Sequence, residues 1–170
     1  AQGSSSRVVN NVTVFGKNAH AMREGEMVQG WGTTSDRSQW SRMNLFVDIP
    51  VSTTGWNQIY LDQDSSKHIW MDEGSVVGVV LYMSAFDIAG NQAISTIYHS
   101  VLRRAVVGNV TQVSGSNVNS EADGALAGIA IRTSADTTNQ AIKVEYNTGG
   151  YGNVVSMHVT VELHEYREYL

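Results

Sequence analysis

Apolar and polar side chains alternate along much of this chain, and the clearest case lies near its C-terminus. Within residues 153–164 one face is apolar and the other polar. The apolar positions are Val155, Met157, Val159, Val161 and Leu163. This period of two predicts a β-strand with one buried face. A second alternating run, residues 140–146, precedes it across a glycine-rich turn at 147–150, which predicts a β-hairpin.

Other segments predict further strands. Residues 75–86 are mostly apolar, which predicts a strand buried on both faces, and residues 87–91 form a turn into a long strand at 92–108. Shorter strands are expected at 40–51, 57–61 and 125–133, the last with Ile129 and Ile131 facing inward. No window carries the apolar stripe of an amphipathic helix over three turns. The sequence therefore predicts an all-β protein, an antiparallel sandwich or jelly roll of about seven to nine strands.

The first 32 residues follow another pattern. A short strand is expected at 8–15, and segments 16–21 and 25–30 then recur at a spacing of about nine residues. Such spacing is typical of β-solenoid turns or of an interwoven stem, which needs a stack or sister chains to bury its apolar face. We therefore divide the chain into an N-terminal stem or β-coil, residues 1–32, and a β-sandwich head, residues 33–170.

Composition narrows the functional classes. The 170 residues carry a net charge of -5, and charged residues make up 16%, below the ~25% of typical soluble domains. The eleven Lys and Arg are scattered, which argues against a nucleic-acid partner. No apolar run approaches the ~18 residues of a membrane span, so we expect no membrane insertion. A weakly charged β surface is typical of chains whose strands are covered by neighbouring subunits.

Tryptophan is the most informative candidate for binding chemistry. All four tryptophans lie within the first 70 residues, and three of them fall at predicted strand ends or loops. Indole rings stack on the apolar faces of sugars, although they also fill cores and subunit interfaces. We assign Trp40, which opens a predicted strand, to the core. The candidate glycan-binding residues are Trp31, Asp36, Arg37, Trp56 and Trp70.

Catalytic and metal chemistry find little support. The chain has no cysteine, no nucleophile elbow, no HExxH motif and no phosphate-binding glycine loop. We therefore expect no enzyme activity, no catalytic residue, no metal and no cofactor. Two weaker candidates are a calcium site and a metal-binding or pH-sensitive strand face, for which a solvated polar surface is the favoured interpretation. Their residues are Asp62, Asp64, Asp72 and Glu73 for calcium, and His158, Glu162 and His164 for the strand face.

Several segments resemble bacteriophage proteins. Residues 12–21 (VTVFGKNAHA) and 25–30 (GEMVQG) look like coils near the ends of phage fibres. Residues 78–87, 107–113, 133–144 and 157–162 resemble the β-rich C-terminal receptor-binding and trimerisation domain of tail fibres and tailspikes. In that family the domain often precedes a self-cleaving intramolecular chaperone. The resemblance extends over residues 8–165 and implies a homotrimer, a place in the virion and recognition of a host surface.

The leading hypothesis is a trimeric phage head that continues an upstream fibre shaft of the same chain. It would bind a host cell-surface polysaccharide or lipopolysaccharide and would act outside the cell. One alternative is a purely structural trimerisation cap, and another is a non-catalytic accessory module of a polysaccharide depolymerase. A monomeric bacterial carbohydrate-binding module is a further alternative, in which residues 8–32 would have no stem function.

Overall fold

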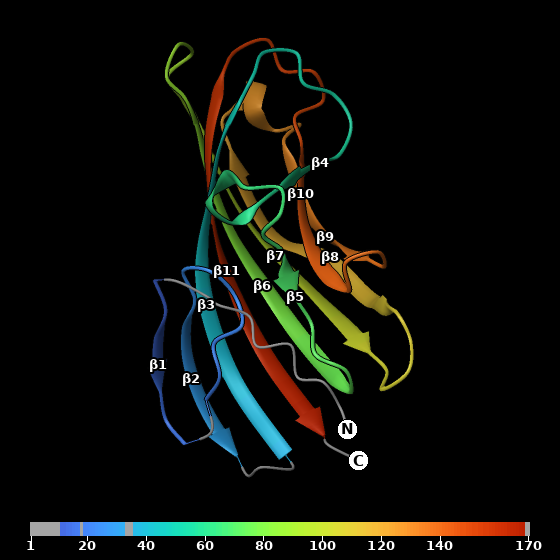
Figure 1. Ribbon diagram of the computed structural model, residues 1–170. Coiled ribbons are helices and arrows are strands. Elements are labelled where there is room, and N and C mark those ends of the chain that lie inside the picture. Colours follow the sequence, from blue (N-terminus) through green and yellow to red (C-terminus); the bar gives the residue numbers. More distant parts are fainter. Residues whose placement is uncertain (1–10, 18, 33–35, 169–170) are drawn as a thin grey trace.

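A computed structural model describes residues 11–17, 19–32 and 36–168 of the chain, and strands dominate it (Figure 1). The only helical elements in these ranges are two 3₁₀ turns, and neither has the length that a membrane-spanning helix requires. The strands are β1 Thr13–Phe15, β2 Met27–Gly32, β3 Asp36–Ile49, β4 Asn57–Ile59, β5 Ile69–Trp70, β6 Ser75–Asp87, β7 Gln92–Arg104, β8 Val110–Ala122, β9 Ala130–Asp136, β10 Ala141–Asn147 and β11 Val155–Glu168, and the 3₁₀ turns are η1 Leu61–Gln63 and η2 Gly124–Leu126. The predicted all-β fold is confirmed.

Two sheets form the sandwich. The large sheet has the order β1-β2-β3-β11-β6-β7-β8. Five of its strands are 13 or 14 residues long, namely β3, β11, β6, β7 and β8. The small sheet has the order β4-β10-β5, with β9 also paired to β10. All described pairings are antiparallel except β1 with β2.

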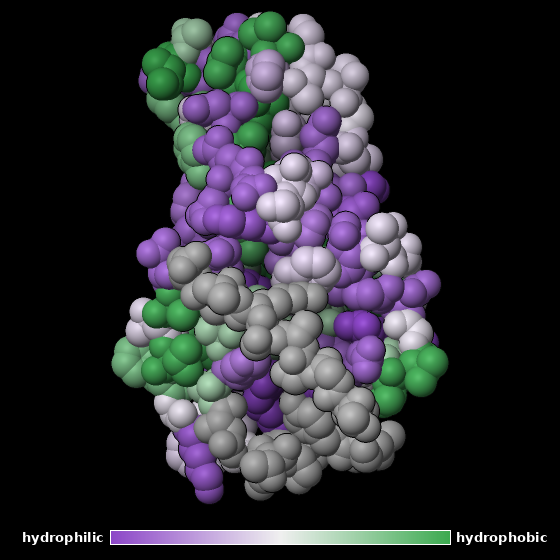
Figure 2. Space-filling view, in the orientation of Figure 1, coloured by the Kyte–Doolittle hydropathy of each residue, from purple (hydrophilic) through white to green (hydrophobic). Residues whose placement is uncertain are grey.

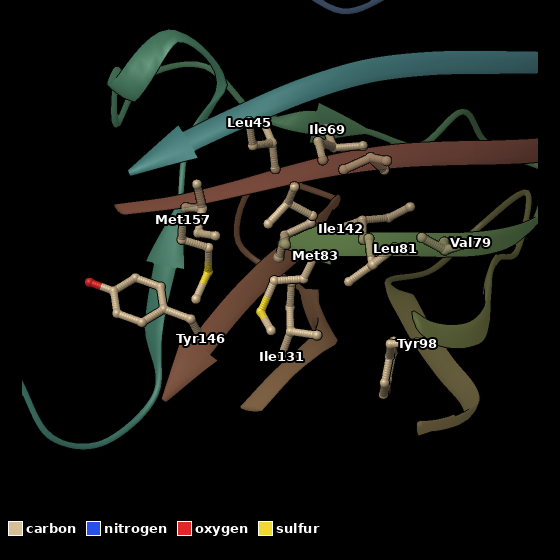
Figure 3. Close-up of a cluster of buried hydrophobic side chains, with 14 of the residues drawn as sticks. Leu45, Ile69, Val79, Leu81, Met83, Tyr98, Ile131, Ile142, Tyr146 and Met157 are labelled. Atoms are coloured by element: carbon tan, nitrogen blue, oxygen red, sulfur yellow. The ribbon is translucent and has the colours of Figure 1, made fainter. Parts of the chain in front are cut away.

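The core lies between the two sheets, where alternate side chains of each meet (Figure 3). The alternation predicted for the C-terminal strand is confirmed, because all five of its apolar residues in β11 are fully buried. Val159 pairs with Leu45 of β3 on one side and with Met83 of β6 on the other. Each such side chain contributes roughly 1.5–3 kcal/mol on burial, so this central strand anchors the sandwich.

The predicted hairpin of β10 and β11 is wrong. β10 pairs with β9, β4 and β5, whereas β11 pairs with β3 and β6, so the chain crosses from one sheet to the other after Asn147. Polar contacts hold this crossing: the Thr148 hydroxyl donates to the Thr53 carbonyl at 2.6 Å, and the Tyr151 hydroxyl donates to Asp87 at 2.6 Å. Alternation marks which side chains are buried, but it does not identify the partner strand.

Strand β6 is buried on one face only within a single chain. Its inward residues are buried, but Val76, Tyr82 and Phe86 on the outer face remain 41–46% exposed. The prediction that both faces are buried is therefore wrong for the chain described here. In the view of Figure 2, hydrophilic residues cover the middle of the visible surface.

The N-terminal segment joins the large sheet. β1 lies parallel to β2, with Thr13 opposite Met27, and β2 pairs with β3 over six residues. The backbones at Gly16 and Gly30 lie so close together that position 16 has no room for a side chain. A Cβ on Gly16 would lie 2.2 Å from the Gly30 carbonyl oxygen. Residues 13–15 of the expected first strand are extended, and residues 8–10 lie outside the described ranges. The division of the chain at residue 32 stays a prediction.

Candidate functional site

The outer face of the large sheet, which points away from the core, carries the candidate site. Outward residues of β11 alternate with its buried ones and include Ser156, His158, Glu162, His164 and Tyr166. Each is flanked by outward residues of β3 on one side and of β6 on the other. Residues distant in the sequence are thereby brought into adjacent cross-strand rows.

At one end of this face lies an open depression of about 370 Å³, which we call the first depression. Two cross-strand rows form it: Trp31, Ser38 and Tyr166 in one, and Gln29, Trp40 and His164 in the next. The Trp31 side chain is 79% exposed and Tyr166 is 50% exposed, while Trp40 is half-buried. Three rings, one imidazole, one amide and one hydroxyl therefore converge on one shallow surface.

A buried ionic cluster lies on the inner side of the sheet at this end of β11. Arg23 Nη1 lies 2.6 Å from Glu26 Oε1, and Arg23 Nη2 lies 3.2 Å from Oε2 of Glu165, with all three side chains fully buried. Burial opposes the charged form of Arg23, but the two carboxylates outweigh it and raise the pKa of the guanidinium. Because Glu165 stands between His164 and Tyr166 in β11, this cluster fixes the strand that presents both outward side chains.

Of the predicted binding residues, Arg37 belongs to the interior. Its side chain is buried and donates from Nη2 to Asp72 Oδ2 at 2.8 Å, and Arg167 bonds to the same carboxylate. Arg37 thus connects β3 to the segment before β6 and does not face the first depression. Asp36 begins β3, and its side chain lies outside what the structure describes.

Trp56 and Trp70 occupy other environments. Trp56 is 38% exposed beside the small sheet, where the Arg132 guanidinium carbon lies 4.0 Å from its ring centroid and Arg132 also pairs with Glu145 at 2.9 Å. Trp70 is half-buried and meets His68 edge-on at 4.9 Å. Trp31 lies beside the start of β3, whereas Trp56 follows its end, and 14 extended residues span roughly 43 Å. The structure does not gather the predicted residues into one site.

Sequence reasoning missed most of the first depression. Trp40, assigned to the core, instead faces outward beside His164. Tyr166 and Gln29 were not considered, although Tyr166 continues the alternation of the C-terminal strand by two residues. Knowing that β2, β3 and β11 are neighbours is what brings these side chains together, and the sequence pattern alone does not contain that information.

The acidic residues considered for calcium each have another partner. Asp62 pairs with Lys67 at 2.9 Å, Glu73 pairs with Arg104 at 3.1 Å, and Asp64 accepts hydrogen bonds from the Ser66 amide and hydroxyl. Those hydrogen bonds lower the pKa of Asp64. Within the described ranges, no group of three or more His, Asp or Glu side chains is arranged to hold a metal ion.

Comparisons with known proteins found similarity only at the level of structure. No family model and no curated protein matches the sequence. The tailspike protein gp49 of Acinetobacter baumannii bacteriophage Fri1, described as a capsular polysaccharide depolymerase, is similar over 84% of this chain with a TM-score of 0.47 and 8% identity. The tailspike protein of Acinetobacter phage vB_ApiP_P1 is similar over 71% of the chain, with a TM-score of 0.35 and 17% identity. The matched region covers 20% of each of those longer proteins.

Proposed function

We propose that this chain is the sugar-binding head of a bacteriophage tail fibre or tailspike, that it acts as a homotrimer on the virion, and that it binds a host cell-surface polysaccharide without cleaving it. The phage setting rests on the resemblance of the coil and strand segments to fibre proteins. The binding function rests on the first depression.

The single observation that carries the binding function is the convergence of Trp31, Trp40 and Tyr166 on one open surface. Exposed aromatic rings give an apolar platform for the C–H faces of a sugar, and their polar edges stay accessible to water. Gln29, Ser38 and His164 lie among the rings and supply donors and acceptors for sugar hydroxyls. All six lie on paired strands of one sheet, so their backbones need little ordering on binding.

Binding without cleavage fits the charges at this site. Glycoside hydrolysis ordinarily uses two carboxyl groups that face each other across the scissile bond. Among the described residues that line the first depression, Glu165 is the one acid, and its buried carboxylate is occupied by Arg23 and Gln39. At the first depression the arrangement therefore supports adhesion rather than hydrolysis.

Trimer assembly is supported by the outer face of β6. Val76 and Tyr82 are two large apolar side chains that are about half exposed on the outer face of β6. Packing this part of the face against sister chains would remove apolar area from water. It would also place a sister chain beside the first depression, because Val76 is the cross-strand neighbour of Tyr166. Three weak sites on one head would then raise avidity through effective concentration without new contacts.

The same apolar face favours a second candidate, a structural cap that registers the trimer and binds no sugar. The two functions differ in what a trimeric sample does with polysaccharide, so one experiment distinguishes them.

The test combines molar mass with binding. Light scattering after size exclusion at low micromolar concentration should give about three times 18.5 kDa. The trimer is then screened against purified bacterial capsular polysaccharides and lipopolysaccharides, and hits are measured by calorimetry. Trp31→Ala should weaken binding about tenfold or more, whereas the matched control Trp56→Ala should retain it.

Three results would contradict parts of this proposal. A trimer that binds no polysaccharide favours the structural cap. Loss of binding in Trp56→Ala but not in Trp31→Ala moves the site to the small sheet. If the wild-type chain is a monomer by light scattering, the proposed homotrimer is wrong.

A further inference from the structure

A second depression lies on the same outer face, at the opposite end of the β3 and β11 pairing, and extends over β6, β7 and the end of β8. Its volume is about 710 Å³, compared with about 370 Å³ for the first depression. Phe46 and Phe86 form its apolar walls, with 43% and 41% of their surfaces exposed. Ser84, Ser95 and His158 add hydroxyl and imidazole groups. Glu121 and Asp123, at and just after the end of β8, also line it, and Asp123 accepts a hydrogen bond from the Ala93 backbone N–H at 2.8 Å. Like the first depression, it combines exposed rings with hydrogen-bonding groups, but it also carries two carboxylates.

The two depressions are connected by one pair of strands. β3 and β11 are paired without a break from one to the other, and Tyr166 and Ser156 at the two ends are ten residues apart. At the rise of an extended strand this separation is roughly 33 Å. A ligand that reached both depressions would therefore be a chain of several sugar units and not a single ring.

On β3 and β11 the surface between the depressions is polar, and Val80 and Tyr82 of the neighbouring β6 flank it on one side. Arg42 stands opposite Glu162, and Asn44 stands opposite Thr160, whose hydroxyl donates to the Asn44 side-chain oxygen at 3.0 Å. Arg42 is exposed and Glu162 is half-buried. Cores of protein–protein interfaces are depleted of charged residues, so this strip is a poor centre for packing against another protein. Amide, hydroxyl and charged groups are suited to the hydroxyls of a polysaccharide instead.

We propose that the outer face of β3 and β11 is one extended binding surface for a linear polysaccharide, with the first and second depressions as its two ends. This inference rests on the proposed function and adds to it the class of ligand, a linear chain long enough to span both ends. The sugar units at each end stack on rings, and the units between them are held by hydrogen bonds to Arg42, Asn44 and Glu162.

The experiment uses the polysaccharide that binds best in the screen described above. It is partially hydrolysed and fractionated by length, and each fraction is titrated by calorimetry into the wild-type protein and into a Phe46→Ala, Phe86→Ala double variant. Val113→Ala, which alters a 59% exposed side chain on β8, is the control. Thermal unfolding confirms that all variants are folded.

The wild-type affinity should rise with ligand length and then level off once the chain spans both depressions. The double variant should lose about tenfold or more in affinity for long chains and nothing for the shortest ones that bind. The control should match the wild type at every length.

Three other outcomes overturn the inference. Affinity that does not depend on length or on Phe46 and Phe86 confines binding to the first depression, and the proposed function then stands without the extended surface. If the molar mass of the double variant differs from that of the wild type, the second depression is a contact between copies and not part of the sugar site. If the folded wild-type protein binds no polysaccharide at all, the inference and the proposed function fail together.

Discussion

Arg23 and Glu165 lie 142 residues apart in the sequence, yet their side chains form an ion pair at 3.2 Å inside the protein. Arg23 also donates from Nε and Nη2 to the Trp70 carbonyl oxygen, at 3.1 and 2.6 Å. One guanidinium therefore ties the N-terminal segment to β5 and to β11. The segment that precedes β2 is fixed to the sandwich by buried charge as well as by strand pairing.

Replacing Arg23 should be strongly destabilising. Arg23→Met leaves the buried carboxylate of Glu26 without its cation and leaves Glu165 with Arg37 at 4.0 Å, and a broken buried pair costs roughly 3–5 kcal/mol. Urea unfolding at neutral pH measures the change in the free energy of unfolding. Lys17→Met, an exposed cation in the same segment, is the control and should change it by less than about 0.5 kcal/mol. Equal stability of the two variants would show that the cluster contributes nothing to folding.

Leu81 and Ile88 should contribute very differently to the free energy of unfolding. Leu81 is fully buried in β6 between the sheets, whereas Ile88 in the following turn is 76% exposed. Leu81→Ala should lower the free energy of unfolding by about 2–5 kcal/mol, because it removes apolar contacts and leaves a cavity. Ile88→Ala should lower it by less than about 0.5 kcal/mol. A small effect of Leu81→Ala would mean that the two sheets do not pack as described.

Local patterns predicted the long strands because their burial is regular. The inward residues of β11, and the turn that joins β6 to β7, follow directly from alternation and from turn-forming residues. The sequence pattern did not predict strand β8, and the structure gives the physical reason. It lies at the edge of the large sheet, and all but a few of its side chains are exposed, so no apolar period marks it.

Long-range pairing is what the sequence could not supply. The hairpin predicted for β10 and β11 is absent because each strand finds better partners in a different sheet. The candidate site shows the same limit. Trp31, a predicted binding residue, is exposed, but Tyr166 of the same depression comes from the far end of the chain, and Arg37 is buried and paired with Asp72. Both facts depend on tertiary contacts between segments more than 30 residues apart.

Asp87 should make the fold sensitive to acid. The Asn153 amide, the Tyr151 hydroxyl and the Gly90 backbone N–H all donate to its carboxylate and lower its pKa below the ordinary value of 3.8. A lowered pKa in the folded state contributes stability at pH values above 3.8, and this stability is lost as the pH falls through the lower folded value. Urea midpoints measured from neutral pH downward should therefore fall more steeply for the wild type than for Asp87→Asn.

Asp87→Asn should also lower the midpoint at neutral pH, because the ionised acceptor of three donors is replaced by a neutral amide. Parallel midpoint curves for the two proteins in acid would contradict the role of this carboxylate. Asn153→Ala removes one donor and should shift the wild-type curve part of the way toward that of the variant.

The outer face of β6 gives the sharpest prediction about assembly. Val76 and Tyr82 are 46% and 41% exposed in the single chain and lie in the part of the face that we assign to contacts between copies. Val76→Asp and Tyr82→Asp would place three carboxylates close together around a trimer axis and bury charge without a partner, so each variant should be a folded monomer. Light scattering gives the mass, and circular dichroism shows whether the β structure is kept. Val107→Asp makes the same change at a 93% exposed turn residue and should remain trimeric. If both β6 variants stay trimeric, this face is not the trimer contact and the copies must meet through another surface.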